Sequence, residues 1–414
     1  MSIRQRAGLS RAAHSDAGRD ARVKDRLRLP YGKGSRRRAA VLAAALPLAF
    51  VTTVATVVPA AEAAPARVRI TRFLGEQTLA HKLQFQNTTF GGISGLDRDP
   101  RTGTWYLLSD DRWRYQPPRF YTGTLDIDRK TGKFSGVKLT GVASLRRPDG
   151  SGYPEYGKAG SPDPESIRYD RFSGRLLWSS EGDRSGGTTT VPVSPLSVRW
   201  TDKKGTETGE LRVPGNLTMT NGDTGPRRNF GFEGLTFTPH GIAAIVEGPL
   251  HQDGEPVTAE HGAPARITLW SRGGTPKGQY VYPLDPLPAA PEPPDGQSDA
   301  GVSEILAIDD HRYLALERSW REGRGYAVKL YEIDLRRATN VLRRDSLATG
   351  PAYRPVAKRL VLDLTAFREP VQNLEALAFG PRLANGQCTV VIGSDDNFSA
   401  EETTQFLAFA AKGC

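Results

Sequence analysis

A short motif occurs five times at nearly even spacing, and this regularity restricts the possible folds more than any other feature of the sequence. In each copy a serine or a glutamate stands within a run of small and apolar residues, and successive copies lie 68 to 71 residues apart. A fixed period of this kind indicates one supersecondary unit that is stacked several times. The copies are Ile93-Ser94-Gly95-Leu96, Pro164-Glu165-Ser166-Ile167, Phe232-Glu233-Gly234-Leu235, Ser303-Glu304-Ile305-Leu306 and Leu374-Glu375-Ala376-Leu377.

The residues that follow each motif predict a β-hairpin. After the first motif, residues 99–103 supply the Pro and Gly of a turn, and an aromatic and aliphatic run at 104–108 leads to Asp110 and Asp111. Turn residues between two short apolar runs are typical of hairpins. The other copies have their second apolar runs at 176–180, 242–246, 313–316 and 389–393, which are followed by Glu181, Glu247, Glu317 and Asp395-Asp396.

The repeat predicts an all-β fold, namely a β-propeller with five blades. Further strand candidates bring each copy to about four short strands, and one such sheet cannot cover both of its faces unless others stack around an axis. The last copy has room for only about three strands, so we expect residues 67–74 to complete it and close the ring. A sixth blade with strands in 79–90 or in the long loops, and an open β-sandwich pair, are the alternatives. The further candidates lie at 119–127, 196–200, 267–270, 328–333 and 405–410.

The first 63 residues predict an export signal that precedes a single domain at 64–414. An Arg-rich stretch ends at Ser35-Arg36-Arg37-Arg38, an apolar run spans 39–58, and Ala61-Glu62-Ala63 offers a small-x-small cleavage site. The long basic lead resembles a twin-arginine signal. A retained membrane anchor and an ordinary secretory signal are the alternatives. We therefore expect a secreted or extracytoplasmic protein.

The charge of the chain is concentrated in this leader. Residues 1–63 hold twelve Lys and Arg against four Asp and Glu, which leaves 44 basic against 42 acidic residues in the remainder. A nearly neutral body without a basic stripe argues against nucleic-acid binding. Contact with a membrane is expected only through an uncleaved signal, and we expect a monomer.

The two cysteines, Cys388 and Cys414, both lie in the predicted exported part. An oxidising destination favours one disulfide, which would fasten the chain end to the strand around Cys388. Two unpaired thiols are the alternative.

The glutamates of the motif predict a cation site. Glu165, Glu233, Glu304 and Glu375 share one repeat position, with Ser94 in the first copy, so we expect them around the axis at similar height. Carboxylates grouped in this way repel one another, which favours a bound cation or a shared proton. Oxygen ligands without Cys or His suit calcium better than magnesium. The alternative is that each glutamate caps backbone amides between blades.

The acids that end the second strands are expected on the same rim. A hairpin brings the start of its first strand and the end of its second strand together, so Asp110 and Asp395 would meet the glutamate ring. Arg112 and Arg318 stand close to these acids in the sequence. Arginine beside carboxylate is most simply an ion pair, but next to a metal it also forms a fork for phosphate. Two loop-like inserts, at 153–164 and 283–300, precede motif strands and are expected on this face.

Six segments of the sequence form a recognisable set. They are 91–112, Asp163-Pro164-Glu165-Ser166-Ile167, Gly231-Phe232-Glu233-Gly234-Leu235, Glu247-Gly248-Pro249-Leu250, Asn373-Leu374-Glu375-Ala376-Leu377 and Ser394-Asp395-Asp396-Asn397-Phe398. Together they resemble the phytase-like domain family, described as the esterase-like part of phytase, from about Gly91 to the C-terminus. The resemblance implies a propeller hydrolase and an association with phosphoester hydrolysis, without fixing a substrate.

The leading hypothesis is an exported, calcium-assisted hydrolase whose substrate is a small anion, a phosphate ester. The predicted calcium ligands are Glu165, Glu233, Glu304, Glu375 and Asp395, and the predicted catalytic residues are Glu233, Glu375, Asp110, Arg112 and Arg318. A propeller that only binds a ligand or a cell-envelope partner, and a calcium-dependent lactone or carboxylic-ester hydrolase, are the alternatives. Because Ser94 interrupts the glutamates, we expect substrate beside the first copy.

Overall fold

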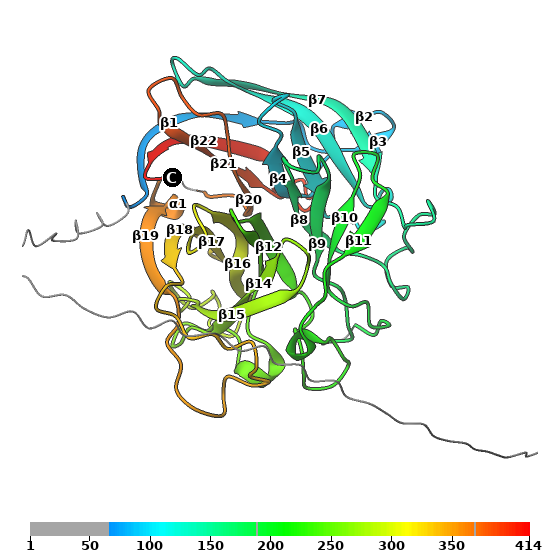
Figure 1. Ribbon diagram of the computed structural model, residues 1–414, viewed down its shortest axis with the longest axis vertical. Helices are drawn as coiled ribbons and strands as arrows, with labels where there is room; N and C mark the ends of the chain where they lie inside the picture. Colours follow the sequence, from blue (N-terminus) through cyan, green and yellow to red (C-terminus); the bar gives the residue numbers. More distant parts are fainter. Residues whose placement is uncertain (1–65, 188, 368–369) are drawn as a thin grey trace, which may run out of the picture. The chain divides into compact units, whose positions relative to one another are not determined.

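The computed structural model describes residues 66–187, 189–367 and 370–414, and these form a β-propeller of five blades (Figure 1). Each blade is an antiparallel sheet of four strands. The first strand of every motif hairpin lies next to the corresponding strands of the two neighbouring blades, so these five strands surround the axis. The predicted export signal lies outside the described residues.

The blades follow one another along the chain. Blade one contains β4 (Ile93–Arg98), β5 (Trp105–Ser109), β6 (Arg119–Ile127) and β7 (Phe134–Ser144), and blade two contains β8 (Pro164–Tyr169), β9 (Leu176–Ser180), β10 (Ser197–Thr201) and β11 (Glu207–Glu210). Blade three contains β12 (Phe232–Phe237), β13 (Gly241–Val246), β14 (Pro264–Ser271) and β15 (Pro276–Pro283). Blade four contains β16 (Ser298–Ala307), β17 (Arg312–Arg321), β18 (Gly325–Asp334) and β19 (Ala357–Asp363). Three short helical turns lie in loops, namely η1 (Gly215–Leu217), η2 (His251–Asp253) and α1 (Leu364–Phe367).

The two ends of the chain build the fifth blade together. It contains β20 (Leu374–Phe379), β21 (Cys388–Ser394), β22 (Gln405–Lys412) and, as its outer strand, β1 (Arg69–Thr78). β1 (blue) runs antiparallel beside β22 (red) from Arg69 opposite Lys412 to Thr78 opposite Gln405 (Figure 1). The predicted ring closure is thereby confirmed.

The described residues form no sixth blade. Residues 79–90 contribute only a short hairpin, β2 (Gln84–Phe85) with β3 (Thr88–Thr89). The predicted disulfide is present between Cys388 and Cys414 and closes a loop of 26 residues. A cross-link of this length stabilises a folded chain by about 3 kcal/mol in the loop-entropy account. No helix in the described part of the chain is long and apolar enough to cross a membrane.

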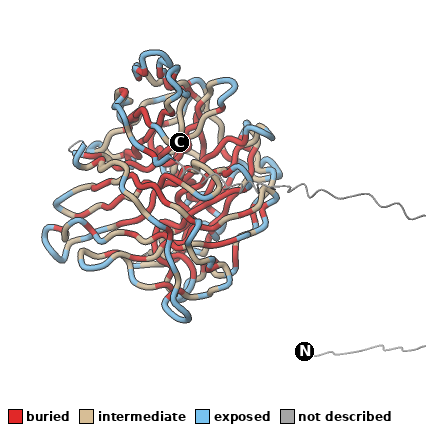
Figure 2. The backbone as a smooth tube through the Cα atoms, turned by 60° about the vertical axis from the view of Figure 1, so that its left-hand side comes forward, coloured by how far each residue is buried: buried red, intermediate tan, exposed pale blue. Residues whose placement is uncertain are grey.

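The core lies between the blades, where buried residues gather at the inner strands and exposed ones at the loop tips (Figure 2). Every residue of β5, β9, β13 and β21 is buried, because these second strands are covered on both faces by neighbouring blades. Trp105, Trp178 and Trp270 are buried in the strands, as expected of core residues. The inner strands therefore place side chains at both ends of the propeller axis.

The side chain of one arginine fills the centre of the propeller, between the inner strands. Arg168 of β8 donates from Nη1 to the carbonyl of Leu96 at 2.6 Å and from Nη2 to that of Ile305 at 3.1 Å, and its Nε donates to the carbonyl of Leu235. These carbonyls belong to β4, β16 and β12, so a single side chain joins four blades. Its Nη2 also lies 2.8 Å from Oε2 of Glu304.

Candidate functional site

A β-bulge recurs at the motif in all five hairpins. The register of the first strand against the second shifts between Ile93 and Gly95, Pro164 and Ile167, Phe232 and Leu235, Val302 and Glu304, and Leu374 and Ala376. A bulge breaks the ladder locally and re-aims the side chain it contains. The repeated bulge therefore gives one motif residue per blade a side-chain direction that a regular strand would not give it.

The position of the bulge in blade four shows that Glu304 does not occupy the repeat position expected from the sequence. In blade four the bulge holds Ser303, whereas Glu304 pairs regularly with Leu316. A shift of one residue along a strand moves a side chain to the other face. The prediction that Glu304 shares the position of the other glutamates is therefore wrong, and Ser303 occupies it.

Glu304 instead lies at the axis. Its carboxylate accepts hydrogen bonds from the Ser166 hydroxyl at 2.7 Å and from the Leu235 amide at 2.8 Å, in addition to the Arg168 ion pair. At the same position blades one and three have glycine, and a Cβ on Gly234 would lie 2.6 Å from the amide nitrogen of Ile305. Small neighbours thus leave room for Glu304 and Arg168 to fill the centre.

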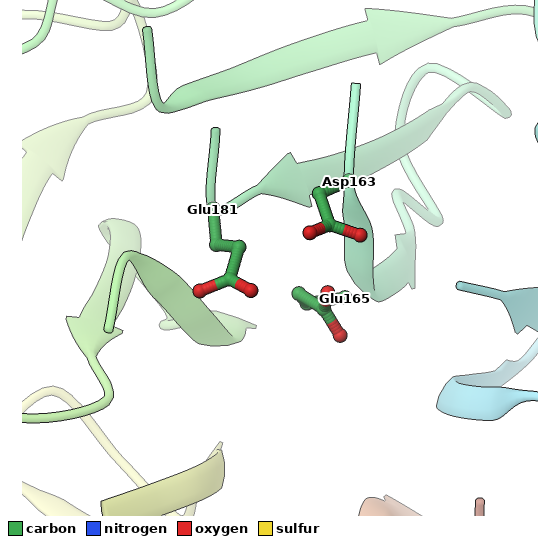
Figure 3. A group of neighbouring side chains, drawn as sticks. All are labelled: Asp163, Glu165 and Glu181. Atoms are coloured by element: carbon green, nitrogen blue, oxygen red, sulfur yellow. The ribbon is translucent and has the colours of Figure 1, made fainter. Parts of the chain in front are cut away.

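The closest carboxylate group lies on blade two. Asp163 and Glu165 flank the start of β8, Glu181 follows β9, and the three are buried with one oxygen of each within 4.8 Å of the others (Figure 3). The Gly231 amide donates to Oε2 of Glu181 at 3.1 Å, and Arg112 pairs with Asp163. Burial raises the pKa of all three carboxyl groups, and the neighbouring carboxylates add to that rise.

A second group surrounds Arg318 of β17. Its Nη2 lies 2.7 Å from Oε1 of Glu247, and its Nε lies 3.6 Å from Oε1 of Glu375. Burial raises the pKa of Glu233, and Glu247 and Glu181 raise it further. Burial works to lower the pKa of Arg318, but the surrounding carboxylates hold it well above its ordinary value. Within the described residues the Nε of Arg318 has no hydrogen-bond acceptor.

The second member of each doubled acid holds its own loop: Asp111 accepts from the Arg114 amide at 2.6 Å, and Asp396 accepts from the Phe398 amide at 3.2 Å. The first members, Asp110 and Asp395, interact electrostatically with the other acids of the site. Burial raises the pKa of Asp110 to about 8, with Glu375 and Asp163 adding to it, and the pKa of Asp395 is raised by burial and by Asp110.

One oxygen of Asp110 is buried without a hydrogen bond. This atom, Oδ1, has no hydrogen-bond donor among the described residues. Gly92, at φ +62°, packs so closely that a Cβ there would lie 2.0 Å from this oxygen. The close approach and the positive φ favour glycine at this position, and Oδ1 of Asp110 lies against Gly92 without a hydrogen bond.

The predicted site residues therefore converge, with Glu304 apart. The groups around Glu165, Arg318 and Asp110 are coupled to one another through their charges. Asp163 was not among the predicted ligands, although it stands two residues before Glu165 and alternate strand positions share a face. Glu317, another second-strand acid, is 2.7 Å from the Tyr282 hydroxyl and pairs with Lys358 at 2.5 Å. The insert at 283–300 also reaches the site, since Oδ2 of Asp299 lies 3.7 Å from Nη2 of Arg318.

The donor set fits a hard divalent cation. Eight buried carboxyl groups surround two arginines, and Asp299 lies beside one of these arginines as well, so the acids outnumber the arginines among the described residues. Buried unpaired carboxylates are costly. All the donors are oxygens, which calcium and magnesium prefer. The buried cluster of Asp163, Glu165 and Glu181 can hold a metal ion. The eight acids are Asp110, Asp163, Glu165, Glu181, Glu233, Glu247, Glu375 and Asp395, and the arginines are Arg112 and Arg318.

Asp110 gives the site a pH dependence that can be measured. Its pKa of about 8 in the folded protein exceeds the unfolded value of about 4, so the folded state binds the proton more tightly between these limits. In chelator, the free energy of unfolding is expected to fall as pH rises from about 4 to about 8, by up to about 1.4 kcal/mol per pH unit for this one group. Asp110→Asn removes that contribution, and urea unfolding of both proteins from about pH 5 to pH 8 measures it. Equal slopes for the two proteins would contradict the assignment.

Known proteins are similar to this chain in fold, and a family model matches its sequence. Two of the similar solved structures are U3-55K, at 10% identity over 81% of this chain and 98% of that one with a TM-score of 0.36, and alpha-L-arabinofuranosidase from Lactobacillus brevis, at 10% identity over 77% and 90% with a TM-score of 0.42. No curated protein matches the sequence. The family model described as "Phytase-like: Esterase-like activity of phytase" matches residues 88–398, which include all five motif hairpins and the acids above. The chain belongs to this phytase-like family.

Proposed function

We propose that this protein is an exported, calcium-assisted hydrolase of phosphate esters. The observation that carries the proposal is the buried excess of carboxyl groups at one end of the axis, with Arg112 and Arg318 among them. A cation balances those charges, and arginines beside it suit the oxygens of a phosphoryl group. Membership of a family named for an esterase-like activity supports hydrolysis.

Asp163, Glu165 and Glu181 are the proposed core of the calcium site, because their oxygens lie closest together. Glu233, Glu375 and Asp395 face the same space and are proposed to complete it or to hold a second ion. Glu304 is left out, since its oxygens are engaged by Arg168, Ser166 and Leu235. When bound, the ion would polarise a phosphoryl oxygen and make a coordinated water more acidic.

The protein groups supply the remaining steps of hydrolysis. A bound cation would lower the raised pKa values of Glu233 and Glu375, so that one of them is ionised and can act as the base. A water oxygen attacks phosphorus, its proton passes to that carboxylate, and the P–O bond to the alcohol breaks. The departing alkoxide needs a proton, and Asp110 is protonated near neutral pH because of its raised pKa of about 8. Arg112 and Arg318 offset the charge of the phosphoryl oxygens in the transition state.

The proposed location outside the cytoplasm rests on two features. One is the basic and apolar pattern of residues 1–63, and the other is the Cys388–Cys414 disulfide, which persists in oxidising compartments.

Calcium should raise the thermal midpoint of the purified protein, and chelator should lower it. Ligand at about a hundred times its Kd stabilises the folded state by about 2.7 kcal/mol, which shifts the midpoint by several degrees. The same protein is then assayed with phosphomonoesters, phosphodiesters and lactones, with and without calcium. We expect calcium-dependent release of phosphate or of the alcohol. Turnover of lactones alone would indicate a carboxylic-ester hydrolase, and an unshifted midpoint without turnover would indicate a binding propeller.

A further inference from the structure

A cavity of about 420 Å³ adjoins the acid site on the side of blades one and five. It shares Asp110 and Arg112 with the site, and its remaining lining includes three aromatic side chains, Trp113, Tyr156 and Phe398. A substrate bound to both the acid site and this cavity would have its phosphoryl end among the carboxylates and the rest of the molecule near these rings. The cavity is thus placed to receive the alcohol portion of an ester.

The walls of the cavity are held in unusual backbone conformations. Trp113 has φ +75°, and the consecutive residues Asn397 and Phe398 have φ +46° and +51°, which non-glycine residues rarely adopt. The hydrogen bonds of Asp111 and Asp396 secure both loops, and the Trp113 indole donates to the carbonyl of Tyr153 at 3.1 Å. The aromatic lining is therefore preformed.

The cations of the cavity are already engaged. Arg112 pairs with Asp163 and lies over the Tyr156 ring, 4.7 Å from its centroid. Arg114 donates from Nη1 to the carbonyl of Asn397 at 3.0 Å and lies over the Tyr115 ring. An alcohol that carried several further phosphates would meet few free positive charges here. The aromatic side chains of the lining, in contrast, offer contacts to a flat apolar group.

We propose that the ester cleaved by this protein has an aromatic ring in its alcohol portion, bound against Trp113 and Tyr156. This proposal rests on the proposed phosphate-ester hydrolysis, because the cavity adjoins the acid site at Asp110 and Arg112. Aromatic pairs contribute about 0.5 to 1.5 kcal/mol beyond the area that they bury, which corresponds to about two- to tenfold in binding.

Benzyl phosphate and cyclohexylmethyl phosphate provide a matched pair of substrates. Both release a primary alcohol of similar size, but only the first has a flat aromatic ring. We expect kcat/KM in calcium to favour benzyl phosphate by about three- to tenfold. Trp113→Ala and Tyr156→Ala should bring the ratio close to one, whereas Trp113→Phe and Tyr156→Phe keep a ring and most of the preference. Melting curves of all four variants establish that they fold.

The control is Phe172→Ala. Phe172 is also an exposed aromatic residue with an arginine over its ring, Arg171 at 4.8 Å, but it lies in the turn at the other end of the blade. It should leave the preference unchanged. Equal turnover of the two esters, or a preference that survives both alanine variants, overturns this inference alone. Absence of turnover overturns the proposed hydrolysis, and affinities for the non-hydrolysable benzyl- and cyclohexylmethylphosphonates then decide the ring preference separately.

Discussion

Replacing Arg168 with methionine is expected to lower the free energy of unfolding by about 3 to 5 kcal/mol, the range for removing one partner of a buried ion pair. The variant leaves the Glu304 carboxylate buried without its cation, and it removes the donor shared by the carbonyls of Leu96, Leu235 and Ile305. Urea unfolding of the purified protein, followed by tryptophan fluorescence, measures the change. The loss should exceed that of any surface substitution because four blades share this one contact.

Two further variants test the cause of this loss. Arg171→Met changes an exposed arginine in the turn that follows β8 and should cost less than about 0.5 kcal/mol. Arg168→Met combined with Glu304→Gln removes both charges and should recover a large part of the stability, since an uncharged pair carries no uncompensated charge. A single Arg168→Met variant as stable as the wild type would show that the axis needs no cation.

Glu233→Gln and Glu375→Gln are expected to reduce kcat/KM for a phosphate ester by about 10²- to 10³-fold each, the scale of losing one preorganised electrostatic group. Both substitutions keep the shape of the side chain and remove one of several buried carboxylates that repel one another. The free energy of unfolding in chelator should therefore stay constant or increase. Activity and stability would then move in opposite directions, as they do at sites built for function.

The matched control is Glu260→Gln, because Glu260 is an exposed glutamate in a polar loop. It should leave both turnover and calcium binding unchanged. Isothermal titration with calcium adds a second readout, in which the two site variants bind more weakly than the control. Wild-type turnover by both Glu233→Gln and Glu375→Gln would remove these residues from the reaction.

The architecture could be predicted because it depends on patterns that one strand carries in its own sequence. The even spacing of the motifs and the Pro and Gly turns predicted five blades, and the short last copy predicted that β1 completes it. The cysteine pair was also predicted, from the expected compartment. Each of these features needs only local residue types and counting.

The centre of the molecule could not be predicted in the same way, because it depends on contacts between blades. Glu304 follows the spacing of the other glutamates, yet the bulge of its hairpin holds Ser303. The apolar residue that follows the bulge was the available signal, since Ile305 aligns with Ile167 and Leu235 only when Ser303 takes the place of Glu165 and Glu233. The role of Arg168 has no local signal, because its acceptors are carbonyl groups on three other strands.

The pairing of β1 with β22 also determines when the propeller can finish folding. β1 is the first strand of the propeller to be synthesised and its partner β22 is the last, so the fifth blade cannot form until β22 has been made. Until then β1 has an open edge, and pairing across so long a stretch of chain is intrinsically slow. A chain that ends before residue 405 would lack β22 and could not join its two ends. Ring closure therefore requires a chain that contains both β1 and β22.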